Sequence, residues 1–254
     1  MSELSHMLRR VTGGRWPRKR QPRPDQPLFS PWKRLGATPG ATTDPAQPHT
    51  ADTLTIDDFW RAPGFQNRID HLHHCFSLAP ATGHVLEFGV FRGGSLNWLA
   101  QWSRGRNDPR VFGFDSFEGL PEEWVRTKTG ERYDAGHFAL SRLPPVVPGV
   151  TLVPGFFDAT LPGWLARHTG PIAFLHNDSD LYSSTFYTLT QLNDRIVPGT
   201  VIVFDELCDW RDSGKYDNWA EGEWKALREW MAAFNRRVVV LSRNEEYAAA
   251  VQVV

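Results

Sequence analysis

The chain has 254 residues, of which 41% are hydrophobic and 22% charged, which is enough to bury one substantial core. Its net charge of −1 conceals an asymmetry. Nine of the 28 Lys and Arg residues lie in residues 1–34, and the rest of the chain carries 19 of them against 27 Asp and Glu. An acidic body excludes a broad basic surface for nucleic acid. No apolar run reaches the roughly 18–20 residues of a membrane helix, so we expect neither nucleic-acid nor membrane partners.

Two cysteines, Cys75 and Cys208, are too few for a disulfide framework and form no CxxC pair, which predicts free thiols in a reducing compartment. The first residues lack the apolar segment of a secretory signal peptide. We therefore predict a cytoplasmic protein.

Residues 1–52 are rich in Pro, Arg, Gly and Thr and show no helical or strand periodicity, so we expect a basic, irregular or disordered arm there. A solvated tail is the simplest interpretation of its charge. The folded domain is expected over residues 53–254. It begins with helical segments, since Thr55 or Asp57 can cap a helix and apolar residues recur at helical spacing from Phe65 to Phe76.

Short apolar runs then alternate with helical segments along the chain. The runs are HVLEFGV, RVFGFDS, VTLVPGFF, PIAFLHND and TVIVFDEL, each ending in Gly, Asp or Glu or passing through one of them into the following turn. Alternation of this kind predicts an α/β fold with a mostly parallel sheet and helices on both faces. The tail RRVVVLSRNEEYAAAVQVV has two β-rich runs without a helix between them, which predicts an antiparallel hairpin at the sheet edge.

The turn in LEFGVFRGGS raises the question of which ligand it holds. Glycines of a dinucleotide fingerprint fall at positions one, three and six, whereas Gly89, Gly93 and Gly94 fall at one, five and six, with Phe91 at the point of pyrophosphate approach. A phosphate-binding loop ending in Gly-Lys-Ser/Thr is absent too. An NAD-dependent dehydrogenase is therefore disfavoured and remains the alternative enzyme class.

S-adenosylmethionine fits the turn better, because its positive sulfonium and amino groups, its ribose diol and its adenine suit carboxylates and an apolar slot. We expect Glu87 and the Gly89 turn to face the methionine end and Asp115 to accept both ribose hydroxyls. Two phenylalanines would flank the adenine, with an aspartate near its amino group. The expected cofactor-binding residues are Glu87, Gly89, Gly93, Gly94, Asp115, Ser116, Phe156, Phe157 and Asp158.

The segments LEFGVFRGG, FGFDSFEGLP, GFFDATLP, NDSDLYSST and PGTVIVFDE resemble the successive motifs of class I S-adenosylmethionine-dependent methyltransferases, and most of all the macrocin and mycinamicin sugar O-methyltransferase group. The resemblance runs from about Leu54 to the C-terminus. It implies a Rossmann-like, seven-stranded sheet with the last strand inserted antiparallel. It also implies a divalent metal and a natural-product hydroxyl as acceptor. A homo-oligomer is expected by analogy alone.

The strand ends also suggest a metal site. Asp178 follows one strand and Asp205 and Glu206 follow another, so hard oxygen ligands suited to Mg²⁺ or another divalent cation would meet. The resemblance gives the same three residues as ligands, although relatives usually carry Asp or Asn at the position of Glu206. Asp180 could replace or assist Asp178, or simply cap the next helix. Bound to the acceptor oxygen, the metal would lower its pKa and fix its approach.

The catalytic residues are harder to choose. Asp178 is expected to act through the metal, and His137 and His176 are the candidates for a general base, because histidine titrates near neutral pH. The segment from Glu118 to about Pro148 is too long for a plain connection and could form a lid. Trp210 and Trp219 could line an acceptor pocket or pack in the core.

These observations together predict a metal-assisted O-methyltransferase acting on a small hydroxylated natural product. A non-catalytic binding module with the same fold is the alternative outside the enzymes. The acidic rim disfavours it, since carboxylates that face one another without a function cost stability.

Overall fold

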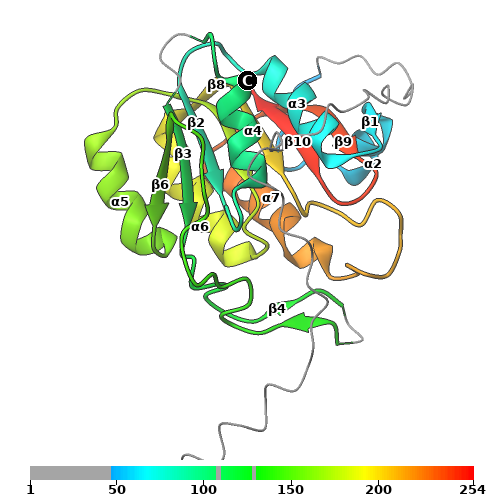
Figure 1. The fold of residues 1–254 in the computed structure, drawn as a ribbon. Helices are drawn as coiled ribbons and strands as arrows, with labels where there is room; N and C mark the ends of the chain where they lie inside the picture. The colour runs from blue at the N-terminus through cyan, green and yellow to red at the C-terminus, as the bar shows by residue number, and fades with distance from the viewer. Residues whose placement is uncertain (1–46, 107–109, 128–129) are drawn as a thin grey trace, which may run out of the picture. The chain divides into compact units, whose positions relative to one another are not determined.

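The computed structural model describes residues 47–106, 110–127 and 130–254. These residues form an α/β fold around an eight-stranded sheet in the order β1-β9-β10-β8-β7-β2-β3-β6 (Figure 1). The five strands from β8 to β6 in that order are parallel, as the alternation in the sequence predicts. They are β2 (His84–Phe88), β3 (Arg110–Asp115), β6 (Val150–Pro154), β7 (Ile172–Asn177) and β8 (Ile196–Phe204).

The C-terminal hairpin forms from β9 (Val238–Asn244) and β10 (Ala249–Val253). Its strand β10 lies between β8 and β9 and is antiparallel to both. The hairpin is not at the sheet edge as predicted, because a further strand pairs with β9. The edge next to β9 is β1 (Gly64–Phe65), a parallel strand of two residues that adds an eighth strand to the expected seven. Two residues are too few to show a strand period, so the sequence placed Phe65 with the following helix.

Helices cover both faces of the sheet (Figure 1). Alternate residues of β2 serve the two cores, with Val85 on the face of α3 and α4, and Leu86 and Phe88 on the face of α5, α6 and α7. The remaining described elements are α-helices, two short 3-10 helices and two strands of two residues each. The bounds are α2 (Ile56–Arg61), α3 (Arg68–Leu78), α4 (Gly94–Trp102), β4 (Trp124–Val125), β5 (Arg132–Tyr133), α5 (Phe157–Arg167), α6 (Tyr182–Leu192), η1 (Asn193–Arg195), η2 (Trp219–Glu221) and α7 (Glu223–Ala233).

Capping residues fix where the first two helices begin. Thr55 is the N-cap of α2, and the Asp58 carboxylate accepts its backbone N–H at 2.9 Å and its hydroxyl at 2.7 Å. Asn67 caps α3 by accepting the N–H of Asp70 at 2.8 Å. The second cap sets the position of Arg68, the first residue of α3.

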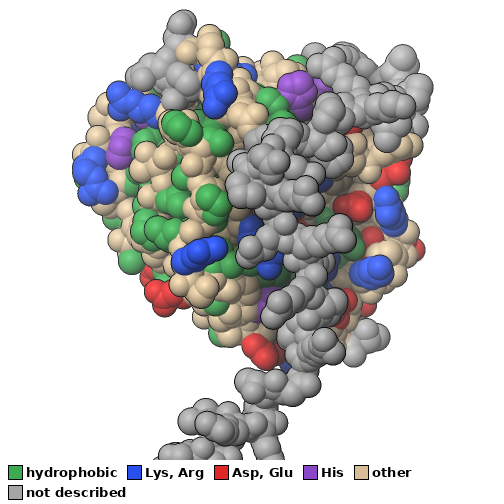
Figure 2. All heavy atoms as spheres, viewed as in Figure 1, with side chains coloured by type: hydrophobic (Ala, Val, Ile, Leu, Met, Phe, Trp, Pro, Cys, Tyr) green, Lys and Arg blue, Asp and Glu red, His purple; other side chains and the backbone are tan. Residues whose placement is uncertain are grey.

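The predicted arm lies mostly outside the described residues, so its irregular structure stays a prediction. Within the described part, His49 forms an antiparallel bridge with Val238 and Ala51 is buried, so chain before residue 53 already packs on the domain. Cys75 and Cys208 are buried free thiols, as predicted. Among the described residues, no helix has both the length and the apolar character to cross a membrane. Figure 2 shows acidic and basic side chains interspersed on one face.

Acidification is expected to destabilise the fold through His71, which is buried in α3 with its Nε2 3.0 Å from the Ser242 hydroxyl. Burial, and then the neighbouring His74, lower the pKa of His71 to about 3. In the unfolded chain the pKa of His71 is about 6.5, so the unfolded chain binds a proton at pH values where the folded ring stays neutral. The neutral ring's contribution to the unfolding free energy is therefore complete above about pH 6.5 and is lost as the pH falls below it.

Urea unfolding at pH 7.5 and pH 5.5 measures this effect. Between the two pH values, the wild type should lose about 1.4 kcal/mol more unfolding free energy than a His71→Gln variant. Equal losses in the two proteins would contradict the assignment of a neutral, buried His71.

Candidate active site

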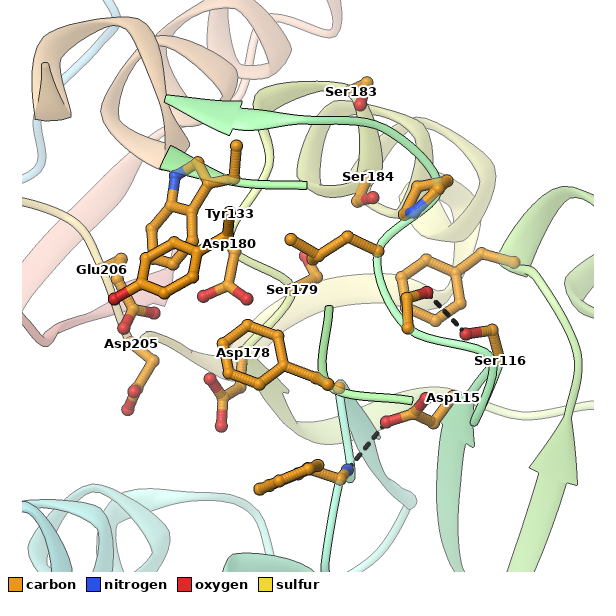
Figure 3. Close-up of a pocket in the computed structure, with 18 of the residues that line it drawn as sticks. Asp115, Ser116, Tyr133, Asp178, Ser179, Asp180, Ser183, Ser184, Asp205 and Glu206 are labelled. Atoms are coloured by element: carbon orange, nitrogen blue, oxygen red, sulfur yellow. Dashed lines mark hydrogen bonds between the residues drawn. The ribbon is translucent and has the colours of Figure 1, made fainter. Parts of the chain in front are cut away.

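A cavity of about 680 Å³ opens at the carboxyl ends of the parallel strands, where the βα turns meet (Figure 3). Nine of the residues selected from the sequence line it, together with aromatic and basic side chains that were not selected. The nine are Gly89, Asp115, Ser116, Phe156, Phe157, Asp158, Asp178, Asp205 and Glu206.

The glycine turn after β2 is built for close backbone contact. Gly89 has φ 88° and donates its N–H to the Phe114 carbonyl at 2.9 Å. A Cβ on Gly89 would lie 1.6 Å from the Asp178 carbonyl oxygen, so only glycine fits there. Gly93 and Gly94 start α4, and neither lines the cavity, which limits the predicted contact to Gly89.

Asp115 ties the turn after β2 to the turn after β3. Its Oδ2 accepts the N–H groups of Val90 and Phe91 at 2.8 and 2.7 Å, and its Oδ1 accepts the N–H of Phe117 at 2.7 Å. The adjacent Ser116 hydroxyl donates to the Gly119 carbonyl at 2.8 Å (Figure 3). A carboxylate offers about four lone-pair positions, so Asp115 retains acceptor capacity toward the cavity.

The turn between β6 and α5 supplies the apolar end of the cavity. Phe156 is the N-cap residue of α5, and the Phe157 ring packs edge-on against Phe88 with centroids 5.0 Å apart. Asp158 lies in the first turn of the helix and also lines the cavity. All three residues are therefore where the sequence placed them.

Four carboxylates gather at the opposite end, from the turns after β7 and β8 (Figure 3). Ligand atoms of Asp178, Asp180 and Glu206 lie within 4.8 Å of one another, as do those of Asp178, Asp205 and His176. Asp180 holds a left-handed backbone with φ 63°, which aspartate tolerates better than most residues. Among the described residues, Glu206 Oε2 is buried without a hydrogen-bond partner.

Burial and mutual repulsion dominate the electrostatics of this cluster. Burial raises the pKa of Glu206 well above its ordinary value, and Asp205 and Asp180 raise it further. The same causes raise the pKa of Asp180, with Asp178 as its strongest acidic neighbour. Added positive charge would relieve both groups.

Arg68 supplies part of that charge, and the sequence gave no sign of it. Its Nη2 donates to Asp178, and its Nε lies 2.9 Å from Asp205 Oδ1. These partners are 110 or more positions away in the sequence. In the sequence itself, Arg68 is indistinguishable from any other polar residue of an amphipathic helix. Its side chain is 40% exposed and lines the cavity.

Glu87 does not line the cavity, contrary to expectation, whereas His176 lies at a strand end beside the acidic cluster, as expected. Both are fully buried below the cavity on the α3 face, with His176 Nδ1 2.9 Å from Glu87 Oε2 and Nε2 3.5 Å from Asp205 Oδ1. Burial lowers the pKa of His176, but the contacts with Asp205 and Glu87 outweigh it and raise the value to about 10. Both ring nitrogens face buried carboxylates and His176 does not line the cavity, so this geometry does not suit a general base.

A second buried acid braces the same turn. Glu223, the first residue of α7, accepts the Glu206 backbone N–H at 2.8 Å and the Asn177 side-chain amide at 2.5 Å. The sequence did not predict this role for Glu223, because an acid in the first turn of a helix is common and belongs to no motif.

The long segment after β3 forms one wall of the cavity, where a lid was expected. Trp124 in β4, Tyr133 in β5 and Phe138 line the cavity, whereas His137 is exposed and does not. Trp210 is 3% exposed and packs on Phe59, and neither it nor Trp219 lines the cavity. Trp124, in the segment after β3, lines the cavity in which Trp210 or Trp219 was considered.

The chain resembles proteins of known activity in sequence and in fold. The family model of macrocin O-methyltransferase (TylF) matches residues 64–218, so the chain belongs to that family. In Streptomyces olivaceus, 8-demethyl-8-(2,3-dimethoxy-alpha-L-rhamnosyl)-tetracenomycin-C 4'-O-methyltransferase is 32% identical over 158 residues, 55% of this chain and 59% of that protein.

In Streptomyces niveus, demethyldecarbamoylnovobiocin O-methyltransferase is 32% identical over 143 residues, 49% of this chain and 52% of that protein. The chain thus spans between 52% and 59% of these curated relatives. The crystal structure of the calicheamicin methyltransferase CalS11 superposes with a TM-score of 0.54 at 24% identity, covering 72% of this chain and 76% of that one. This likeness shows a shared fold.

Replacing Gly89 by Ala should destabilise the protein, because the new methyl group collides with the Asp178 backbone and the residue needs a positive φ. We expect a loss of at least ~2 kcal/mol of unfolding free energy. Gly94→Ala is the matched control, since a Cβ there meets nothing within 4 Å. It should keep or slightly raise stability. Urea unfolding of both variants makes the comparison, and equal stability of the two would contradict the close contact.

Proposed function

We propose that the protein transfers a methyl group from S-adenosylmethionine to a hydroxyl of a small natural product, with a sugar moiety as the acceptor class. The observation that carries the proposal is that one cavity contains both groups of residues. The Gly89 turn and Asp115 lie at one end of it and four carboxylates lie at the other. Membership in the macrocin O-methyltransferase family supports it. Both curated relatives are named as O-methyltransferases, one of a rhamnosyl tetracenomycin C and the other of demethyldecarbamoylnovobiocin.

In this proposal the cofactor lies between the turns after β2, β3 and β6. The Gly89 turn leaves room for the methionine end, and Asp115 accepts a ribose hydroxyl at the one of its about four lone-pair positions that its three backbone N–H donors leave free. Phe156 and Phe157 flank the adenine, and Asp158 accepts from its amino group. The cofactor supplies the methyl group, and these residues fix its orientation toward the carboxylates.

A divalent cation such as Mg²⁺ fits the carboxylate end. The donor set is all oxygen, the unpartnered Glu206 Oε2 is available as a ligand atom, and the acids repel one another in the absence of further positive charge. Asp178, Asp205 and Glu206 would hold it, with Asp180 close enough to join them. When bound, the ion would lower the pKa of an acceptor hydroxyl.

The remaining wall suits a hydroxylated ring. Trp124, Tyr133 and Phe138 offer flat apolar surfaces, and the carboxylates offer acceptors for hydroxyl groups. Among the described residues that line the cavity there is no histidine, so we assign the proton of the acceptor hydroxyl to a carboxylate at this end.

Isothermal titration tests the cofactor assignment. S-adenosylhomocysteine should bind with a dissociation constant in the micromolar range, on the order of −8 kcal/mol, because the cavity offers both a carboxylate for the ribose and an apolar slot. NAD⁺ should give no heat, since Phe91 stands where a pyrophosphate must approach the backbone. Heat from NAD⁺ and silence from S-adenosylhomocysteine would replace the proposal with a dehydrogenase.

Glu206→Gln tests the metal assignment with little change in shape. Methyl transfer should fall about 100-fold or more and cofactor affinity should change little, because the ligand lies at the acceptor end. Chelation of divalent ions should mimic the variant in the wild type. Glu221→Gln is the control, because the side chain of that exposed acid pairs with Lys225 at 3.1 Å and does not line the cavity. Full turnover in Glu206→Gln or with chelator would remove the metal from the proposal.

A further inference from the structure

Arg68 bridges two turns that come from different strands. Its Nη2 donates to Asp178 after β7, and its Nε lies 2.9 Å from Asp205 after β8. The second contact has the distance of an ion pair but lacks hydrogen-bond geometry, because Arg68 Nε has no hydrogen-bond partner among the described residues. One guanidinium therefore connects the turn after β7 with the turn after β8.

The positive charges are distributed unequally over the cluster. Asp205 lies between two basic side chains, with Arg68 Nε 2.9 Å and His176 Nε2 3.5 Å from its Oδ1. Asp180 and Glu206, in contrast, make no ion pair within 4.0 Å among the described residues, although each lies within 4.8 Å of Asp178. Asp178 is thus shared between a bound guanidinium and a pair of acids whose nearest further cation, Arg126, acts on them only from beyond ion-pair distance.

The Arg68 guanidinium borders the space that a metal ion would occupy. Asn67 fixes the start of α3, but the Arg68 side chain beyond it is 40% exposed and borders the cavity. Its partners are more enclosed, with Asp178 22% and Asp205 9% exposed, so they would be left with uncompensated charge if Arg68 moved away without a replacement. A divalent ion supplies that replacement, and its exchange with Arg68 would make Asp178 and Asp205 available together as ligands.

We propose that Arg68 is a resident cation that competes with the divalent ion for Asp178 and Asp205, so that it positions these carboxylates without the ion and sets how tightly the ion binds. The inference rests on the proposed function, in which those acids hold a metal. Arg68 then acts as a positioning residue. It keeps the like charges from driving the two turns apart, and it weakens metal binding by occupying two ligands.

The test measures Mn²⁺ binding by calorimetry and melting temperature in chelator and in Mn²⁺, without cofactor or acceptor. Arg68→Gln should bind Mn²⁺ about tenfold more tightly than the wild type, because the competing charge is gone. It should also melt lower in chelator and gain more from Mn²⁺. Arg68→Lys, which keeps the charge but loses the two-point contact, should fall between them. A merely structural residue would not raise metal affinity when removed.

Arg61→Gln is the matched control, since the exposed Arg61 pairs with Asp58 at 3.4 Å and does not line the cavity, and this variant should bind Mn²⁺ like the wild type. Equal or weaker Mn²⁺ binding by Arg68→Gln would overturn the inference. So would absence of Mn²⁺ binding in every protein, and S-adenosylhomocysteine binding measured on the same samples then shows separately whether the methyltransferase proposal stands. If Arg68→Gln unfolds in chelator, Arg68→Lys decides the affinity comparison.

Discussion

The repulsion among the carboxylates after β7 and β8 is the constraint on which the site depends. A parallel sheet brings the carboxyl ends of its strands to one edge, and here that edge gathers Asp178, Asp180, Asp205 and Glu206. Such a cluster persists only with compensation, because buried like charges raise one another's pKa. The chain supplies part of it with the Arg68 guanidinium, which contacts Asp178 and Asp205, and with the His176 ring, whose Nε2 lies 3.5 Å from Asp205 Oδ1.

The same edge joins the two halves of the cavity. Gly89 lies so close to the Asp178 backbone that a Cβ would not fit, and the Asp178 N–H donates to the Phe88 carbonyl at 2.8 Å. The turn proposed for the cofactor and the turn proposed for the metal are therefore joined directly. Asp115 fixes the first of these turns through its backbone N–H bonds. A methyl donor and an acceptor oxygen must meet in line, and a shared, rigid backbone is a physical means of aligning them.

Backbone positions were predictable and side-chain directions less so. Strand ends follow from periodicity and turn residues, which is why Gly89, Asp115 and Asp205 were placed correctly at the cavity. Glu87 was misplaced because a strand buried on both faces shows no alternation that tells which face a residue takes. Arg68 was missed because its ion pairs join segments more than 100 residues apart, and the reach of a long side chain leaves no mark on local sequence.

The most direct test is a crystal structure with S-adenosylhomocysteine and Mn²⁺, with the manganese located by anomalous scattering. The account predicts the ribose at Asp115, the adenine against Phe156 and Phe157, and a manganese peak among the carboxylates of Asp178, Asp205 and Glu206. A cofactor bound elsewhere, or a cavity that binds it while no manganese peak lies among those carboxylates, would contradict the account.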